Sequence, residues 1–124
     1  MTDQKRRILV VDDEIDLRDL LAHLLTGAGY EVEAASDGEE AISILQKKKH
    51  DLALLDIQMP NMNGIQVLKF IHEHTPSTKA IMLTGYADLK YAMEAKEYGA
   101  KDFISKPYKL EDVLSTISRI LGEQ

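Results

Sequence analysis

Residues 8–25 read ILVVDDEIDLRDLLAHLL, and this stretch decides the fold class. Its first four residues, Ile8 to Val11, form a β-branched apolar run that predicts a short strand buried on both faces. Behind it, apolar residues recur at intervals of three and one, which predicts a helix with one apolar stripe. The stripe consists of Leu17, Leu20, Leu21, Leu24, Leu25 and Ala28.

The same alternation of strand-like and helix-like segments continues along the chain. Asp37, three residues before Glu40, predicts an N-cap with a partner like that of a capping box. Strands are predicted at 30–35, 52–55, 80–83 and 103–104, and helices behind Asp37, around 67–71, at 87–98 and at 110–121.

This pattern predicts an α/β protein of five strand–helix units, (βα)₅, with short connections. Alternating strands and helices form parallel sheets covered by helices on both faces, with right-handed crossovers. Five strands are too few for a closed eight-stranded barrel, so we expect a doubly wound open parallel sheet of strand order 2-1-3-4-5.

Length and composition limit the class of protein. With 124 residues, the chain is expected to form a single domain over 1–124 with its core at about 6–121. It has no cysteine, which excludes disulfide scaffolds, thiolate metal sites and cysteine nucleophiles. The formal net charge of −6 disfavours binding to nucleic acid or anionic lipid by bulk charge.

No secretory signal or membrane span is predicted. The start, MTDQKRR, is followed by only four apolar residues before two aspartates, and the longest apolar runs have the length of strands. We therefore expect a cytoplasmic protein with no membrane association, and with no direct nucleic-acid binding because a basic recognition element is lacking.

Polar residues gather where the predicted strands end. Asp12 and Asp13 follow the first strand, Asp56 the third, Thr84 the fourth and Lys106 the fifth. Ligands of open α/β sheets bind at this carboxyl edge. Converging carboxylates repel one another unless a cation joins them, and an oxygen-only ligand set suits Mg²⁺, with Mn²⁺ possible. Aspartate can also accept a phosphoryl group, so the residues indicate magnesium-dependent phosphoryl chemistry.

Four motifs give the chain a family resemblance. They are VVDDE at 10–14, LLDIQMPNMNG at 54–64, LTG at 83–85 and KPY at 106–108. Each is weak alone, but all four stand in order at strand ends. The chain thus resembles a bacterial two-component response-regulator receiver domain of the chemotaxis-regulator type, whose fold is the same (βα)₅ sheet.

The resemblance implies a role for each matching residue. Asp56 would be the phosphoacceptor, with Lys106 and Thr84 binding phosphoryl oxygens. Asp12, Asp13, Asp56 and the backbone carbonyl of Gln58 would hold Mg²⁺. The Lys106–Pro107 bond would be cis. Phe103 would be the aromatic switch residue, which turns inward when Thr84 moves.

The resemblance also implies partners. The phosphoryl donor would be a sensor histidine kinase or a histidine phosphotransfer protein. The target would be a downstream effector protein or a fused output domain, reached through a surface of the fourth helix, fifth strand and fifth helix. The domain would catalyse only its own phosphorylation and dephosphorylation, as a monomer or a weak phosphorylation-dependent dimer.

Three other readings of the residues stay open. A magnesium phosphohydrolase resembling the haloacid dehalogenase group would need an acid where Gln58 stands. A flavodoxin-like electron carrier would need a hydroxyl- and glycine-rich loop instead of Asp12-Asp13-Glu14. The third is a receiver fold that serves only as an interaction module.

Aromatic and basic residues outside the strand ends allow two interpretations each. Phe103 suits the core as well as a switch. The lysines at 47–49 are expected to be a solvated helix end, and the four histidines are not expected to bind metal. Tyrosines near the fourth and fifth units indicate either packing or a partner-facing surface: Tyr86, Tyr91, Tyr98 and Tyr108.

Overall fold

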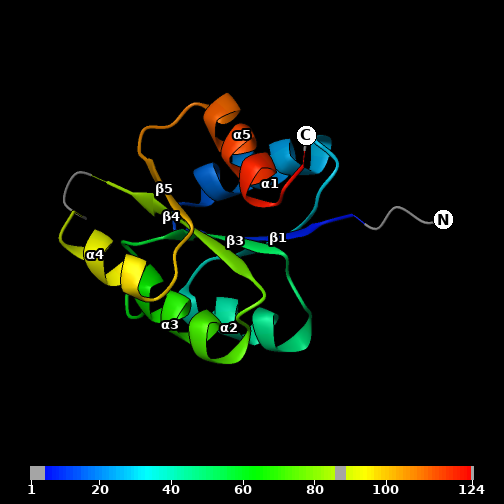
Figure 1. The fold of residues 1–124 in the computed structure, drawn as a ribbon. Coiled ribbons are helices and arrows are strands. Elements are labelled where there is room, and N and C mark those ends of the chain that lie inside the picture. The colour runs from blue at the N-terminus through cyan, green and yellow to red at the C-terminus, as the bar shows by residue number, and fades with distance from the viewer. Residues whose placement is uncertain (1–4, 86–88, 124) are drawn as a thin grey trace.

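The computed structural model describes residues 5–85 and 89–123. Five parallel strands form one sheet of order β2-β1-β3-β4-β5, as predicted. Helices and strands alternate along the chain (Figure 1). The elements are β1 (Arg7–Val11), α1 (Ile15–Gly27), β2 (Glu31–Ala35), α2 (Gly38–Lys47), β3 (Leu52–Asp56), α3 (Gly64–His74), β4 (Lys79–Thr84), α4 (Leu89–Glu97), β5 (Asp102–Ser105) and α5 (Leu110–Ile120).

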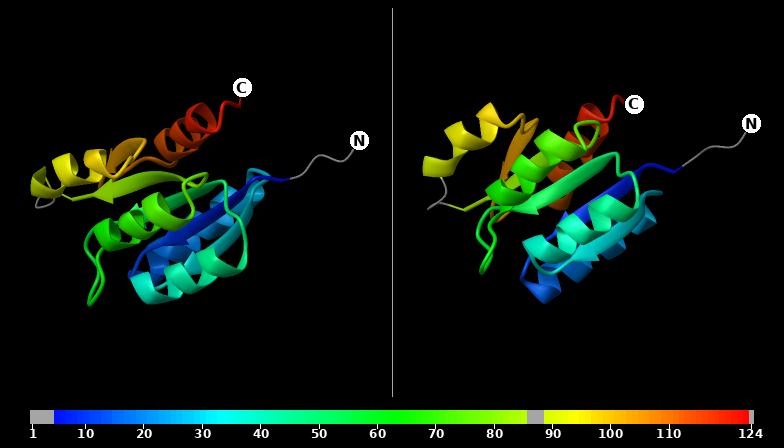
Figure 2. Two further views of the ribbon diagram at one scale, coloured as in Figure 1. Left: turned by 60° about the horizontal axis from the view of Figure 1, so that its bottom comes forward. Right: turned by 90° about the horizontal axis from the view of Figure 1, so that it is seen from below.

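Helices cover both faces of the sheet. Residues of α1 and α5 pack on one face, and residues of α2, α3 and α4 pack on the other. Seen from below, α2 and α3 lie in front of the strands, and α1 and α5 lie behind them (Figure 2). Side chains alternate between the two hydrophobic clusters along each central strand, because successive residues of a strand face opposite ways. The interior positions of the central strands are therefore all apolar, as the sequence predicts.

Two local predictions need correction. Leu20, counted in the apolar stripe of the first helix, is 53% exposed, and the buried residues of α1 are Leu21 and Leu25. β2 does not alternate cleanly either, since the Glu33 carboxylate forms a hydrogen bond of 2.8 Å with Nε2 of the buried His50. An edge strand has a neighbour on one side only, which leaves its side chains partly exposed on both faces.

Helix caps fix where α2 and α3 begin. Asp37 accepts a hydrogen bond from the Glu40 N–H, as predicted, whereas the Glu40 carboxylate accepts from the Ser36 N–H. At α3, Asn63 and Gln66 form a complete capping box with distances of 3.1 and 3.0 Å. The box holds α3 against the turn that follows β3.

The α3 cap gives a prediction about stability. Asn63→Ala should lower the free energy of unfolding by about 1 kcal/mol, because the Gln66 N–H loses its partner. Asn63→Ser keeps a capping oxygen and serves as the control. Urea denaturation measures both, and equal stability of the two variants would contradict a capping role.

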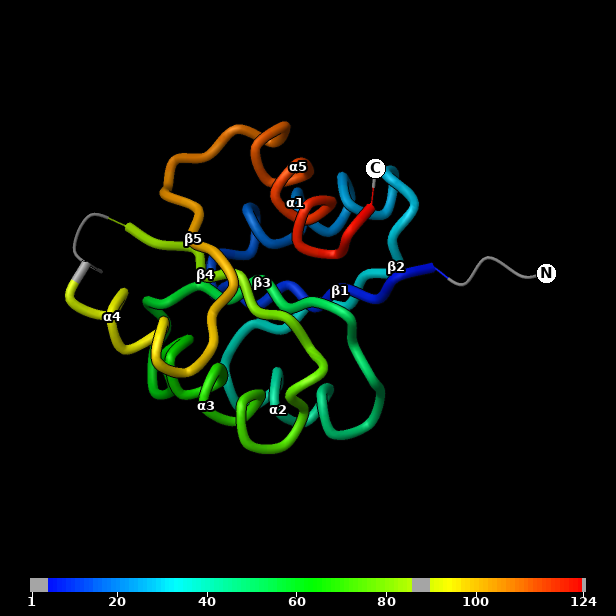
Figure 3. Tube along the Cα trace, in the orientation of Figure 1, coloured from blue at the N-terminus to red at the C-terminus, as the bar shows by residue number. Residues whose placement is uncertain are grey.

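No helix within the described part of the chain has both the length and the apolar character that crossing a membrane requires. The trace leaves β3 and β4 on the same side of the molecule, on the left of the view (Figure 3). The predicted site residues at the strand ends are therefore brought to one edge.

Candidate functional site

Three aspartates meet at the carboxyl edge of the sheet. Asp12 and Asp13 follow β1, and Asp56 ends the neighbouring β3. One carboxylate oxygen from each lies within 4.8 Å of the others. Asp12 and Asp56 are buried, whereas Asp13 is exposed. We call these three residues the acidic cluster.

Lys106 joins the two buried members of the acidic cluster. Its Nζ lies 3.3 Å from Asp12 Oδ2 and 3.2 Å from Asp56 Oδ2. Its backbone N–H donates to the Thr84 carbonyl at 2.7 Å, and the following peptide bond to Pro107 is cis. These backbone features fix Lys106 at the end of β5, from where its ammonium group reaches the cluster.

One ammonium does not compensate three carboxylates. Burial and, after it, the charge of Asp12 raise the pKa of Asp56 to about 7, because Lys106 opposes both only in part. For Lys106, burial lowers the pKa, but the carboxylates of Asp56 and Asp12 outweigh burial and the net shift is upward. The cluster therefore has an excess of negative charge that a divalent cation would neutralise.

The donor set fits a hard cation. All side-chain ligands are carboxylate oxygens, and one of the three carboxylates faces solvent, from which an ion can enter. Mg²⁺ binds through one or two carboxylates while it keeps several waters, and Mn²⁺ accepts the same oxygen ligands. The residues present therefore suit Mg²⁺ or Mn²⁺.

Backbone groups orient the buried carboxylates. The Glu14 N–H donates to Asp12 Oδ1 at 2.9 Å, and the Gln58 N–H donates to Asp56 Oδ1 at 3.2 Å. Arg18 Nη1 donates to the Asp12 carbonyl at 3.2 Å. Arg18 was not predicted as part of the site, and its place one turn into α1 gives no sequence signal for this contact.

Gly64 is a second residue whose role the sequence pattern does not reveal. Its N–H donates to the Ile57 carbonyl at 3.0 Å. A Cβ atom at this position would lie only 2.4 Å from the Asp56 carbonyl oxygen. The sequence predicts only a turn here, whereas the structure shows that the start of α3 packs directly on the backbone of Asp56.

Thr84 and Phe103 lie beside the acidic cluster and not within it. The Thr84 hydroxyl donates to the Ile104 carbonyl at 3.4 Å. Ala80 and Met82 belong to the cluster under α2–α4, so alternation along β4 places Thr84 on that face. Phe103 packs on the same face, partly buried. The two predicted switch residues thus share one side of neighbouring strands.

The predicted group of tyrosines does not form one surface. Tyr91 and Tyr98 pack against the α2–α4 face, whereas Tyr108 packs against the α1–α5 face; Tyr86 lies outside the described residues. The Tyr108 hydroxyl is buried and has no hydrogen-bond partner within the described ranges. Burial and then the nearby carboxylates of the site raise its pKa.

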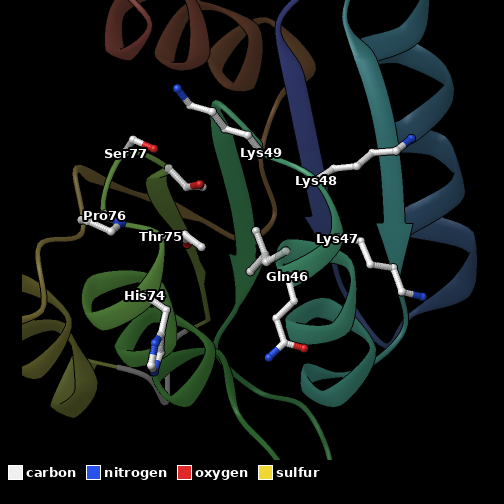
Figure 4. Close-up of a pocket in the computed structure, with 10 residues that line it drawn as sticks. Gln46, Lys47, Lys48, Lys49, His74, Thr75, Pro76 and Ser77 are labelled. Carbon is white, nitrogen blue, oxygen red and sulfur yellow. The ribbon is translucent and has the colours of Figure 1, made fainter.

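A separate cavity of about 360 Å³ lies at the amino ends of β3 and β4, opposite the acidic cluster. Its rim includes Lys47, Lys48, Lys49, His74 and Ser77. The three lysine side chains extend away from one another (Figure 4). They therefore do not converge on one anion, which agrees with the expectation of a solvated helix end.

Comparisons with known proteins agree with this geometry. Residues 8–118 match the family model described as response regulator receiver domain. The chain is 37% identical to chemotaxis protein CheY of Thermotoga maritima, covering 93% of this chain and 97% of that protein. It is 33% identical to sporulation initiation phosphotransferase F of Bacillus subtilis, covering 93% of each.

A relative of greater length and a solved structure extend the comparison. Regulatory protein AtoC of Escherichia coli is 36% identical over 95% of this chain, which spans only 26% of that protein. A CheY-like receiver domain protein from Methanospirillum hungatei superposes with a TM-score of 0.93, 36% identity and coverage of 96% and 95%. The chain belongs to the response regulator receiver domains, the phosphoacceptor domains of two-component signalling.

Proposed function

We propose that Asp56 of this chain accepts a phosphoryl group from the phosphohistidine of a sensor kinase or a histidine phosphotransfer protein. The observation that carries the proposal is the position of Asp56, buried between Asp12 and Lys106 at the end of a central strand. An Asp56 carboxylate oxygen would form the new bond to phosphorus while the bond from phosphorus to the donor nitrogen breaks.

The other residues of the site would hold the reacting group in place. Asp12, Asp13, Asp56 and the Gln58 carbonyl would bind Mg²⁺, with Asp13 a direct ligand and Asp12 acting partly through water. The cation would supply positive charge next to the phosphoryl oxygens. Lys106, now shared between Asp12 and Asp56, would turn to a phosphoryl oxygen and neutralise part of the negative charge of the phosphoryl group.

The change would reach the surface through Thr84 and Phe103. If the Thr84 side chain turned toward a phosphoryl oxygen, the hydrogen bond from its hydroxyl to the Ile104 carbonyl would break. The space that Thr84 leaves is on the face where Phe103 packs, so Phe103 could turn inward. The surface of α4, β5 and α5 would then shift in population toward a state that an effector protein or a fused output domain binds.

Phosphorylation with a small acyl phosphate tests the proposal. We expect a base-labile mass increase of one phosphoryl group on the wild type with Mg²⁺, little without Mg²⁺, and none on Asp56→Asn. Asp16→Asn, which changes an exposed aspartate of α1, is the matched control and should behave as the wild type. Intact-protein mass spectrometry measures the adduct.

Two results would contradict the proposal. Labelling of Asp56→Asn at the wild-type rate would exclude Asp56 as the acceptor. Failure of the wild type to take either the acyl phosphate or the phosphoryl mimic beryllofluoride, with Mg²⁺ present, would leave only the role of an interaction module.

A further inference from the structure

Four side chains connect α3 and α4 on the surface of the domain. Lys69 Nζ lies 3.2 Å from Glu94 Oε2 and 5.1 Å from the centre of the Tyr98 ring. The rings of His72 and Tyr98 meet edge to face, with centroids 5.8 Å apart and an interplanar angle of 82°. Lys69 and His72 come from α3, and the other two from α4 and its end. We call this set the α3–α4 clasp.

The described part of α4 buries little apolar surface. Among residues 90–97 of α4, Ala95 is the one fully buried apolar residue, Tyr91 is partly buried against the same core, and Met93 is 76% exposed. By contrast, α3 buries five residues against the sheet. A helix with so little buried apolar surface is held weakly by the hydrophobic effect. The clasp therefore adds polar and aromatic contacts to the limited apolar packing that fixes α4 to the domain.

The space beneath the clasp is incompletely filled. A cavity of about 240 Å³ lies between the ends of α3 and α4 and the starts of β4 and β5, lined among others by His72, Ala80, Tyr98 and Lys101. Because close packing is what resists sliding of one helix on another, a cavity at this place leaves α4 room to move once the clasp opens.

We propose that the α3–α4 clasp holds α4 in the unphosphorylated arrangement and so limits how readily the domain adopts its phosphorylated state. This inference rests on the proposed function of Asp56. The clasp is closed in the structure in which Thr84 still bonds to Ile104. By linkage, contacts made only in that arrangement weaken the binding of any ligand that requires the other.

Variants of Lys69 test the clasp. Lys69→Gln removes the ion pair with Glu94 and the cation over Tyr98 together. Lys69→Glu places two carboxylates side by side, and Glu94→Lys added to it restores an ion pair of reversed sense. Lys90→Gln is the matched control, because Lys90 lies 5.0 Å from the Tyr91 ring within α4 and does not reach α3 by any contact described.

Two measurements are needed. Amide hydrogen exchange of α4 without ligand should be faster in Lys69→Gln and Lys69→Glu than in the wild type and Lys90→Gln. Binding of beryllofluoride with Mg²⁺ should be about 2- to 5-fold tighter in the same two variants, as expected for loss of an exposed pair with a cation–π contact. The Lys69→Glu, Glu94→Lys double variant should recover part of both effects.

The outcomes separate this inference from the proposed function. If beryllofluoride binds the wild type but the Lys69 variants bind it no more tightly than Lys90→Gln, the regulatory role of the clasp is wrong. Unchanged exchange in α4 would show that the clasp does not hold the helix. If the wild type binds no beryllofluoride, the proposed function fails and the coupling fails with it, while exchange still reports whether α4 is held.

Discussion

Gly64→Ala is expected to destabilise the protein by about 3 kcal/mol, in the upper part of the range for overpacking. The new Cβ would lie 2.4 Å from the Asp56 carbonyl oxygen and 3.1 Å from Ile57 Cα. Both neighbours are backbone atoms, which cannot rotate away as a flexible side chain can. The start of α3 or the end of β3 must therefore move, and with it the peptide that presents the Asp56 carboxylate.

A matched substitution separates this contact from the loss of a glycine as such. Gly27 ends α1, and a Cβ built on it meets no atom within 4 Å. Gly27→Ala should therefore be neutral or stabilising by up to about 1 kcal/mol, because alanine favours a helix over glycine. Urea denaturation with the two variants in parallel checks the difference, and Gly64→Ala should also accept phosphate from an acyl phosphate more slowly.

Equal stability of the two alanine variants would contradict the close approach. A destabilised Gly64→Ala that is phosphorylated at the wild-type rate would show that the backbone of Asp56 does not follow α3. The first result would make the PNMNG segment a turn only, which is all that its residue types indicate.

The sequence predicts the sheet well because the signal for its central strands is strong. β1, β3 and β4 are almost continuous apolar runs, and only a sheet covered on both faces buries such runs completely. The signal fails at the edges of the fold. In β2 the predicted alternation is lost, because Glu33 turns to the buried His50 and the strand has one neighbour only.

The residues of the acidic cluster were predictable from the sequence, whereas the contacts that orient them were less so. Every strand except β2 ends in, or is followed directly by, a polar residue of the site, and parallel strands deliver these residues to one edge, so the acidic cluster follows from the fold. The contact of Arg18 with the Asp12 carbonyl depends on how α1 is rotated on the sheet. That rotation also exposes Leu20, and residue spacing alone does not determine it.

The relation between Thr84 and Phe103 also required the structure. Phe103 pairs with Met82, one of the residues that place Thr84 on the α2–α4 face. A shift of the register by one residue would move Phe103 to the other face. The motifs identify both residues, but only the register shows that they lie on the same side of the sheet.

Asp56→Asn is expected to stabilise the metal-free protein at neutral and alkaline pH. Burial, followed by the charge of Asp12, raises the pKa of Asp56 from 3.8 to about 7 in the folded state. The folded protein then binds more protons at this site than the unfolded chain between about pH 4 and pH 7. The contribution of Asp56 to stability therefore falls as the pH rises through this window, and asparagine removes the charge that causes the fall.

The difference in stability between Asp56→Asn and the wild type should depend on pH as expected for ionisation of Asp56. Below about pH 4 both states carry a protonated Asp56, so wild type and Asp56→Asn should differ little. At pH 8, we expect the variant to be more stable by roughly 1–3 kcal/mol, because Lys106 compensates only part of the repulsion. Thermal or urea unfolding in EDTA over this range measures the difference, and Asp16→Asn should show no comparable trend.

Adding Mg²⁺ should remove the difference in stability between Asp56→Asn and the wild type at pH 8. A cation that binds the folded acidic cluster stabilises it by about 2.7 kcal/mol at a concentration 100 times its dissociation constant. Asp56→Asn offers the ion one carboxylate fewer, so it should gain less and lose its advantage at pH 8. A difference that stays the same with and without Mg²⁺ would mean that the repulsion at Asp56 is not relieved by a bound cation, and that the acidic cluster is not the metal site.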